Sequence, residues 1–270
     1  ASYWLAGMTV FDAIGHAYTT VATGGFSTHD ASFAHFDSAL IEAIAIAFMM
    51  LGAVNFSLHF LAWRNGSING YIRDPELRVF LAITLIATLL IALALAGTGV
   101  YPESVEALRF SIFQTVSVIT TTGYGTDTFA EWPLFAPLLL AVLAFVGGSV
   151  ASTSGGMKVV RIMILFLQGA REAFSLIHPR AVSNIKLGGR VVPDAVIKSV
   201  WGFYSLFILT ALLLTGCMMA LGLDLETAFG ATVASLTLLG PGLGDVATSF
   251  ASVGDAAKWL AIFGMLVGRL

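Results

Sequence analysis

The sequence predicts an all-α membrane protein built from similar units packed around a common axis. Three observations lead to this fold class. Hydrophobic residues make up 57% of the chain and charged residues 11%, with a mean hydropathy of +0.90, whereas soluble domains are roughly 25% charged. Short segments that end in glycine-rich turns alternate with long apolar segments. Cationic residues gather in the links opposite those short segments.

The first part of the chain contains one short and one long apolar segment. Residues 9–28 are too short and too polar to span a bilayer but apolar enough to enter it, which is typical of a re-entrant segment. The run at 36–63 is long enough to cross with tilt. Residues 1–8 resemble the tail of a helix, so we expect the chain to be a fragment whose beginning lies upstream.

The central part repeats this order. A span at 77–96 ends at Gly97 and Gly99, and a short segment follows at 102–129. The next apolar run begins near Pro133, breaks at 147–156 and resumes at 157–177. The break is drawn almost wholly from Gly, Ser, Ala and Thr, a composition that does not favour an uninterrupted helix.

The C-terminal part follows the same order once more. A long span covers 195–221, a short segment covers 224–244, and a final apolar run at 256–270 stops before crossing. We therefore expect the chain to be cut at this end too.

These parts form an internal repeat of outer helix, pore helix, filter loop and inner helix. Phe11 precedes Gly24 by 13 residues, Phe110 precedes Gly123 by the same 13, and the third unit has a shorter interval. Non-helical backbone at membrane depth is tolerated where it is buried in protein or lines a watery cavity, so the loops should meet around one central pore. We predict pore repeats at 1–76, 77–190 and 191–270, counted as the second, third and fourth, with the first repeat absent from this chain.

The stretch Thr-Thr-Thr-Gly-Tyr-Gly-Thr at 120–126 indicates the chemistry of that pore. It is close to the Thr-Val-Gly-Tyr-Gly filter of potassium channels, in which backbone carbonyl oxygens replace the hydration shell of the ion. Glycine suits such a loop because it reaches left-handed dihedrals without steric cost. A ring of about four carbonyls per layer is needed, so a fourth loop must come from outside the chain.

Charge predicts the orientation of the units in the membrane. The positive-inside rule places the basic links in the cytoplasm, and they contain Arg64, Arg73, Arg78, Arg171, Arg180, Lys186, Arg190 and Lys198. The filter side is rich in Asp and Glu, and an acidic outer mouth concentrates cations. The same carboxylates also fit solvated helix caps, Asp224 and Glu226 among them.

Six motifs in order resemble the Trk/Ktr/HKT superfamily of potassium transporters, and within it the membrane subunit of bacterial Trk potassium-uptake systems. They are Phe-Asp-Ala-Ile-Gly-His at 11–16, Gly-Gly-Phe-Ser-Thr-His-Asp at 24–30, Thr-Thr-Gly-Tyr-Gly-Thr at 121–126, Ser-Thr-Ser-Gly-Gly-Met-Lys at 152–158, Leu-Gly-Pro-Gly-Leu-Gly at 239–244 and Gly-Arg-Leu at 268–270. The resemblance implies a potassium-channel-like fold of four pseudo-repeats in one chain, each giving one filter loop.

The resemblance also implies the site residues. Gly24, Gly123 and Gly240 would be the filter glycines, within the filter segments Ala22, Thr23, Gly24, Gly25; Thr121, Thr122, Gly123, Tyr124; and Leu238, Leu239, Gly240, Pro241. The break would be an intramembrane gate loop beneath the filter, with Gly147, Gly148, Ser152, Thr153, Ser154, Gly155, Gly156 and Lys158. Small residues give such a loop the freedom that a gate needs. A helix that ends near Val150 before an ordinary loop is the alternative.

Arg269 completes the predicted gate. If the last helix starts near Asp255, Arg269 lies roughly 21 Å along it, inside a hydrocarbon core of about 30 Å. An intramembrane arginine is costly and usually faces a cavity or a partner. The resemblance places it beneath the filter, so we expect Arg269 to contact the gate loop and to add an electrostatic barrier.

The function expected from these residues is potassium uptake across the bacterial inner membrane through a selective, gated pore, with K⁺ as the transported ion and no cofactor in this chain. We expect neither an enzyme nor nucleic-acid binding. The resemblance implies a multi-pass homodimer with a cytoplasmic nucleotide-binding regulatory subunit, for which the links at 64–78 and 178–198 are candidate docking surfaces or simply solvated flanks. The alternative function is a secondary transporter with broken helices that binds a small solute at 147–156.

Overall fold

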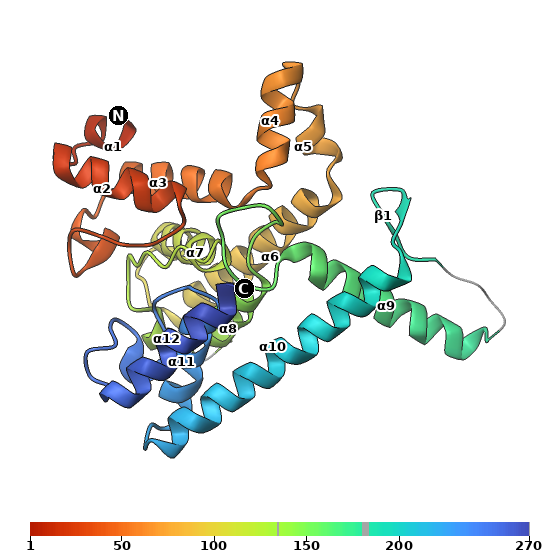
Figure 1. The fold of residues 1–270 in the computed structure, drawn as a ribbon. Coiled ribbons are helices and arrows are strands. Elements are labelled where there is room, and N and C mark those ends of the chain that lie inside the picture. The colour runs from red at the N-terminus through yellow and green to blue at the C-terminus, as the bar shows by residue number, and fades with distance from the viewer. Residues whose placement is uncertain (134, 180–183, 270) are drawn as a thin grey trace.

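The computed structural model describes residues 1–133, 135–179 and 184–269, which are mostly helical (Figure 1). We group the elements in chain order into an N-terminal unit (α1–α5), a central unit (α6–β2) and a C-terminal unit (α10–α12). Within the described residues, α6 and α10 are long and apolar enough to cross a membrane, and the bent pair α3–α4 is a third candidate if it counts as one span.

The N-terminal unit contains a short helix followed by a bent long one. Its elements are α1 (Ser2–Leu5), α2 (Val10–Val21), the 3₁₀ turn η1 (Ser32–His35), α3 (Ala39–Ala53), α4 (Phe56–Asn65) and α5 (Asn69–Arg73). The Thr9 side chain caps α2 by accepting a hydrogen bond from the Asp12 amide. The predicted re-entrant segment at 9–28 therefore consists of α2 and the loop after it.

The expectation of one continuous span at 36–63 is wrong. The chain bends by 94° between α3 and α4, where Val54 is extended and Asn55 caps α4 through the Ser57 amide, 2.8 Å away. The two helices taken together are apolar enough for a span, so composition alone does not mark the bend. The backbone groups beside the bend bond to Ser149, Ala151 and Thr153, as described below.

The central unit contains a span, a short helix and an interrupted helix. Its elements are α6 (Pro75–Thr98), α7 (Ser104–Ile119), η2 (Phe129–Glu131), α8 (Phe135–Val146), α9 (Val159–Ile177), β1 (Lys186–Leu187) and β2 (Arg190–Val191). Asp74 caps α6 with Pro75 at its first position, and Gly99 ends it with a left-handed φ of 68°. The break between α8 and α9 agrees with the predicted interruption, and Arg180 of the basic link lies outside the described residues.

The C-terminal unit contains α10 (Asp194–Ala220), α11 (Leu225–Leu236), η3 (Gly244–Val246) and α12 (Asp255–Arg269). Asp224 caps α11 by accepting from the amides of Glu226 and Thr227. The hydrogen bonds of Thr227 to the Asp224 carboxylate hold the pKa of that carboxyl below its ordinary value. Asp224 is therefore a helix cap as well as one of the acidic residues predicted on the filter side.

The core lies around α7, which packs against α6 and α8 on one side and against the N-terminal unit on the other. One cluster joins Val118 and Ile119 of α7 to Phe80 and Ile91 of α6 and to Leu140 of α8. A second joins its other face to the N-terminal unit through Phe113, Tyr124, Phe33, Ile41 and Met49. Because α7 is buried on nearly every side, the loop that follows it lies in the middle of the molecule (Figure 1).

A bidentate ion pair joins α7 to α3. Arg109 donates to both carboxylate oxygens of Glu42, at 2.8 and 2.7 Å, and Glu42 is only 3% exposed. Removing one partner of a buried pair leaves an uncompensated charge, at a cost of about 3 kcal/mol. We predict that Glu42→Leu lowers the melting temperature of the detergent-purified protein by roughly 6–12 °C. Asp37→Asn is the control, because Asp37 touches the same arginine but is largely exposed. Equal melting of the two variants would contradict this.

Candidate functional site

The candidate filter loops follow the C-terminal ends of α2, α7 and α11. Each loop contains two residues with positive φ, separated by one residue: Thr23 (48°) and Gly25 (67°), Thr121 (53°) and Gly123 (82°), and Leu238 (63°) and Gly240 (99°). Such alternation turns successive peptide groups in a regular way. The three loops thus share one backbone conformation although their sequences differ.

Backbone hydrogen bonds fix the equivalence of the loops. Thr23, Thr121 and Leu238 each donate to the carbonyl three residues back, and the residue after each donates to the carbonyl five residues back. Gly25, Gly123 and Gly240 each lie four residues beyond the last residue of their helix. The expectation that Gly24 is equivalent to Gly123 is therefore corrected: Gly25 occupies that position, and Gly24 corresponds to Thr122 and Leu239.

The loops pack edge to edge. A Cβ on Gly25 would lie 1.8 Å from the carbonyl oxygen of Thr122, and one on Gly123 would lie 1.9 Å from that of Leu239. Each glycine thus touches the backbone of the next loop, at the same height. No neighbouring atom of the described chain lies within 4 Å of the corresponding point on Gly240. The loops that contain Gly25, Gly123 and Gly240 therefore follow one another in that order around an arc.

Side chains of the N-terminal unit support the central loop from behind. Tyr124 is fully buried, and its hydroxyl group contacts the hydroxyl oxygens of Thr19 at 2.5 Å and Thr20 at 3.0 Å. The Ser117 hydroxyl donates to the Tyr124 carbonyl at 2.7 Å, and the Ala34 amide donates to the Gly125 carbonyl at 3.2 Å. These partners hold the loop in place, and sequence reasoning did not identify them.

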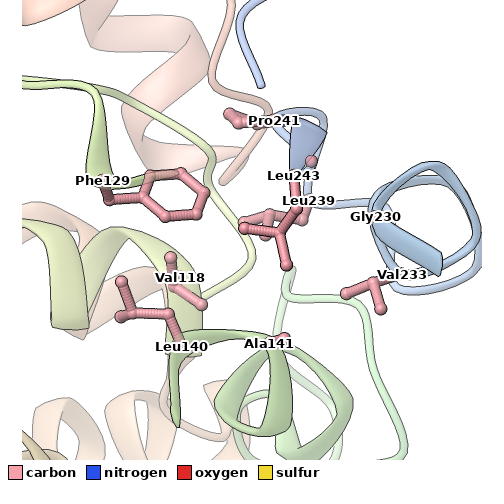
Figure 2. Close-up of a pocket in the computed structure, with 10 residues that line it drawn as sticks. Val118, Phe129, Leu140, Ala141, Gly230, Val233, Leu239, Pro241 and Leu243 are labelled. Atoms are coloured by element: carbon pink, nitrogen blue, oxygen red, sulfur yellow. The ribbon is translucent and has the colours of Figure 1, made fainter. Parts of the chain in front are cut away.

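Apolar packing supports the C-terminal loop. Figure 2 shows Leu239 and Leu243 facing Val118 and Phe129 of the central unit across a small pocket. Its volume of about 10 Å³ is at most enough for one water molecule, and its lining is apolar. The pocket is therefore a packing contact between the two units and not a ligand site.

The interrupted stretch between α8 and α9 lies against all three loops. Thr153 bonds through its side chain to that of Thr23 at 3.0 Å, and the Gly155 amide donates to the Thr121 side chain at 2.5 Å. A Cβ on Gly155 would lie 2.1 Å from the Thr237 carbonyl oxygen. This stretch, residues 147–158, is called the gate loop below. It contacts the first residues of the filter loops, next to the C-terminal ends of the helices that precede them.

The gate loop also pairs with the bend between α3 and α4. The amides of Ser149 and Thr153 donate to the carbonyls of Ala53 and Gly52, at 2.9 and 3.2 Å, and the Phe56 amide donates to Ala151 at 3.0 Å. These bonds satisfy the backbone that the bend leaves unpaired. The two ends of the loop pack closely together, since a Cβ on Gly147 would lie 2.4 Å from the Gly155 carbonyl oxygen.

A buried carboxylate of α6 accepts hydrogen bonds from the gate loop and from α9. Glu76 is 8% exposed and accepts hydrogen bonds from the amides of Val150 at 2.8 Å and Val160 at 3.3 Å. One carboxylate oxygen thus joins the gate loop, at Val150, to the first turn of α9, at Val160. No sequence motif marked Glu76, because a single Glu after Asp-Pro resembles an ordinary first-turn charge.

Two cations face the loop. Lys158 donates to the carbonyl and the hydroxyl oxygen of Ser154 within its own loop. Arg269, at the end of α12, donates to the Thr153 carbonyl at 3.3 Å. Figure 1 shows the end of α12 beside the gate loop. The expected contact of Arg269 with this loop is thus present in the structure.

Acidic groups lie at the opposite end of the pore helices. Asp12 accepts from the hydroxyls of Thr28 at 2.5 Å and Thr9 at 2.6 Å, and these bonds hold its pKa below the ordinary value. His29 lies 3.3 Å from the same carboxylate and stacks on His35 at 3.6 Å. Asp12 therefore stays ionised at neutral pH and contributes negative charge to this mouth.

Comparison with known proteins decides the family. The family model TrkH, described as a cation transport protein, matches residues 1–270. The chain belongs to the TrkH family. This confirms the resemblance drawn from the six sequence motifs.

Relatives and a solved structure of the TrkH family agree with this. The chain is 49% identical over 274 residues to the Trk system potassium uptake protein TrkH of Vibrio parahaemolyticus, covering 100% of this chain and 56% of that protein. It is 46% identical to the protein of the same name in Escherichia coli K12, with 99% and 55% covered. The crystal structure of the potassium transporter TrkH from Vibrio parahaemolyticus matches at 48% identity and a TM-score of 0.95, with 99% and 58% covered.

The TrkH-family match confirms the predicted fold class of an all-α membrane protein with pore helices. The chain spans about 56% of the length of the curated relatives it matches. The structure brings together the predicted filter segments and the predicted gate residues Thr153, Gly155 and Arg269. It also shows that Glu76 and the bend at Val54 contact the predicted gate loop.

Proposed function

We propose that the complete protein carries K⁺ into a bacterial cell through a selective, gated pore, and that it is not an enzyme. The observation that supports this most directly is the arc of three equivalent loops, packed edge to edge with alternating left-handed residues. Backbone held in this way can present rows of carbonyl oxygens to a dehydrated cation. The relatives named above are potassium uptake proteins, which supports the same ion.

In this proposal K⁺ binds to backbone carbonyls of the three filter segments. These are 22–25, 121–124 and 238–241, with Gly25, Gly123 and Gly240 at equivalent positions. The protein needs no cofactor for this, because the ion is cargo and the ligands are backbone oxygens. Discrimination by such a filter depends on the number and rigidity of the carbonyls, and the hydrogen bonds behind Tyr124 supply rigidity.

The pore is proposed to be completed by a fourth repeat outside this chain. The three units then correspond to the second, third and fourth repeats, at 1–76, 77–190 and 191–270. Gly25 and Gly123 each adjoin the next loop, and the free edge at Gly240 has the same shape without a neighbour from the described chain. A fourth loop between Gly240 and Gly25 would close the ring.

We propose that the protein lies in the bacterial inner membrane, with the filter facing the periplasm and the basic links in the cytoplasm. A cytoplasmic nucleotide-binding subunit would regulate it, and two copies would form a homodimer. The basic links at 64–78 and 178–198 would offer a cationic docking surface to an acidic patch of that subunit. Of the second link, residues 180–183 lie outside the described structure.

The growth phenotype of a filter variant tests the proposed function. The full-length protein should restore growth of a potassium-uptake-deficient bacterium at low external K⁺, and Gly123→Asp should not. The new side chain would have to occupy the space of the Leu239 carbonyl, and it would add charge to the filter. Membrane levels of both proteins are compared by immunoblot. Equal rescue at equal level would refute the filter assignment.

A separate prediction concerns Arg269. Its guanidinium group contacts the gate loop and places a positive charge below the filter, where it opposes cation passage. We expect Arg269→Ala to raise rubidium influx into proteoliposomes without the regulatory subunit by about threefold or more, and Arg269→Lys to retain most of the barrier. Unchanged influx in Arg269→Ala would contradict a role in gating.

A further inference from the structure

A second feature, outside the filter loops, is an open groove between α9, the β1–β2 hairpin and the first turn of α10. Its volume is about 680 Å³, within the range of roughly 300–1,000 Å³ typical of ligand sites. Figure 1 shows the hairpin beside the region where α9 and α10 run together. The groove is lined by Val160, Arg161, Ile164, Leu187, Arg190, Val191, Val192, Pro193, Ala195, Val196, Ser199 and Val200.

The charge of the groove is one-sided. Arg161 and Arg190 are its ionisable lining residues, and among the described residues neither pairs with a carboxylate. The nearest acid in sequence, Asp194, pairs with Arg171 at 3.5 Å. Arg161 lies over the Phe203 ring at 3.9 Å and is half-buried. Stacking on the ring fixes the guanidinium plane and leaves N–H groups on its edge, a geometry suited to phosphate.

Apart from Ser199, the rest of the lining is apolar. Valine, leucine and isoleucine side chains of α9, α10 and the hairpin form the walls, above a small core of Ile164, Ile185, Ile197 and Val200. The groove lies at the N-terminal end of α10, the longest apolar helix described here, on the side with the basic links. A free inorganic anion would gain nothing from such walls, whereas an acyl chain would bury apolar area against them.

We propose that this groove binds an anionic phospholipid. Its phosphate would bind Arg161 and Arg190, and the part of an acyl chain nearest the headgroup would lie along Val160, Ile164 and Val196. Basic pockets between helices at the cytoplasmic boundary are suited to such headgroups. The lipid would join α9, which begins directly after the gate loop, to the outer helix α10. Binding does not depend on the proposed transport activity.

Lipid binding to the purified full-length protein tests this. Native mass spectrometry in detergent is used to titrate dioleoylphosphatidylglycerol, with dioleoylphosphatidylcholine as the zwitterionic comparison. We expect the double variant Arg161→Gln/Arg190→Gln to weaken phosphatidylglycerol binding by about fivefold or more and to leave phosphatidylcholine unchanged. Arg161→Lys/Arg190→Lys should retain the charge and most of the binding. The matched control Arg64→Gln/Arg73→Gln removes two exposed cations of α4 and α5.

Three outcomes would overturn the proposal. The double glutamine variant and the control pair could bind phosphatidylglycerol equally well. Millimolar inorganic phosphate could displace the lipid completely, which would assign the site to a soluble anion. The double variant could lose a copurifying cytoplasmic subunit while its lipid affinity stays unchanged, which would assign the groove to that subunit. Failure of lipid binding with normal rubidium uptake would leave the pore proposal intact.

Discussion

Gly25→Ala is expected to abolish rubidium uptake by the full-length protein, with a loss of about 100-fold or more, whereas Gly24→Ala should stay within about threefold of the parent. The two glycines are adjacent and chemically identical. The structure nevertheless gives them different environments, so the pair is a matched test of the register of the filter.

The difference has two physical causes. Gly25 has a φ of 67°, in the left-handed region that side chains rarely adopt, and its Cβ would lie 1.8 Å from the Thr122 carbonyl oxygen. That atom belongs to backbone, so it cannot yield without displacing the neighbouring loop. Gly24 has no positive φ, and its Cβ would meet the Phe26 ring at 3.7 Å, an ordinary contact.

The measurement compares rubidium influx for both variants in proteoliposomes that contain equal amounts of protein. Influx of sodium is recorded as well, because a displaced loop should lose selectivity along with rate. A greater loss for Gly24→Ala than for Gly25→Ala would restore the register that the spacing from Phe11 suggests. Equal mild effects would show that the loop tolerates a methyl group, against the edge-to-edge packing.

That error of register shows what sequence spacing can and cannot decide. Counting from phenylalanine assumes that Phe11 and Phe110 are equivalent, but Phe11 lies in the first turn of α2 and Phe110 in the middle of α7. The constant interval is instead the one from the end of the helix to the glycine. A helix end depends on backbone hydrogen bonds, which the sequence pattern marks only within a few residues.

Much of the rest could be predicted because the signals are local. The lengths of α6, α10 and the short helices follow from apolar runs between glycines and caps, and the break between α8 and α9 follows from its small residues. The bend at Val54 depends on backbone hydrogen bonds to residues about a hundred positions further along the chain. The role of Glu76 depends on a hydrogen bond to the distant gate loop. Neither leaves a trace in hydropathy, so both required the structure.

Glu76 provides the second large prediction. We expect Glu76→Leu to raise rubidium influx in the absence of any regulatory subunit by about tenfold or more, because the gate loop loses the acceptor that joins it to the start of α9. The part-buried amides of Val150 and Val160 would then lose their side-chain acceptor, at about 1–3 kcal/mol each. Opening the loop lets water satisfy them, so the open state is favoured.

The isosteric variant separates this effect from charge. Glu76→Gln keeps a carbonyl oxygen in the same place, which can still accept both hydrogen bonds, so its influx should stay close to that of the parent. Glu172→Leu removes an exposed carboxylate from α9 and serves as the control. If Glu76→Gln opened the pore as much as Glu76→Leu, the negative charge near Lys158, and not the hydrogen bonds, would hold the loop.

The direction of the effect distinguishes gating from mere destabilisation. A misfolded variant conducts less at equal membrane level, whereas a variant whose closed state alone is weakened conducts more. Because Glu76 is the second residue of α6, within the basic link at 64–78, it joins the first turn of that helix to the gate loop and to the start of α9. A shift of this end of α6 would change the Glu76 contacts first, which gives a regulator docked on the link a direct physical route to the gate.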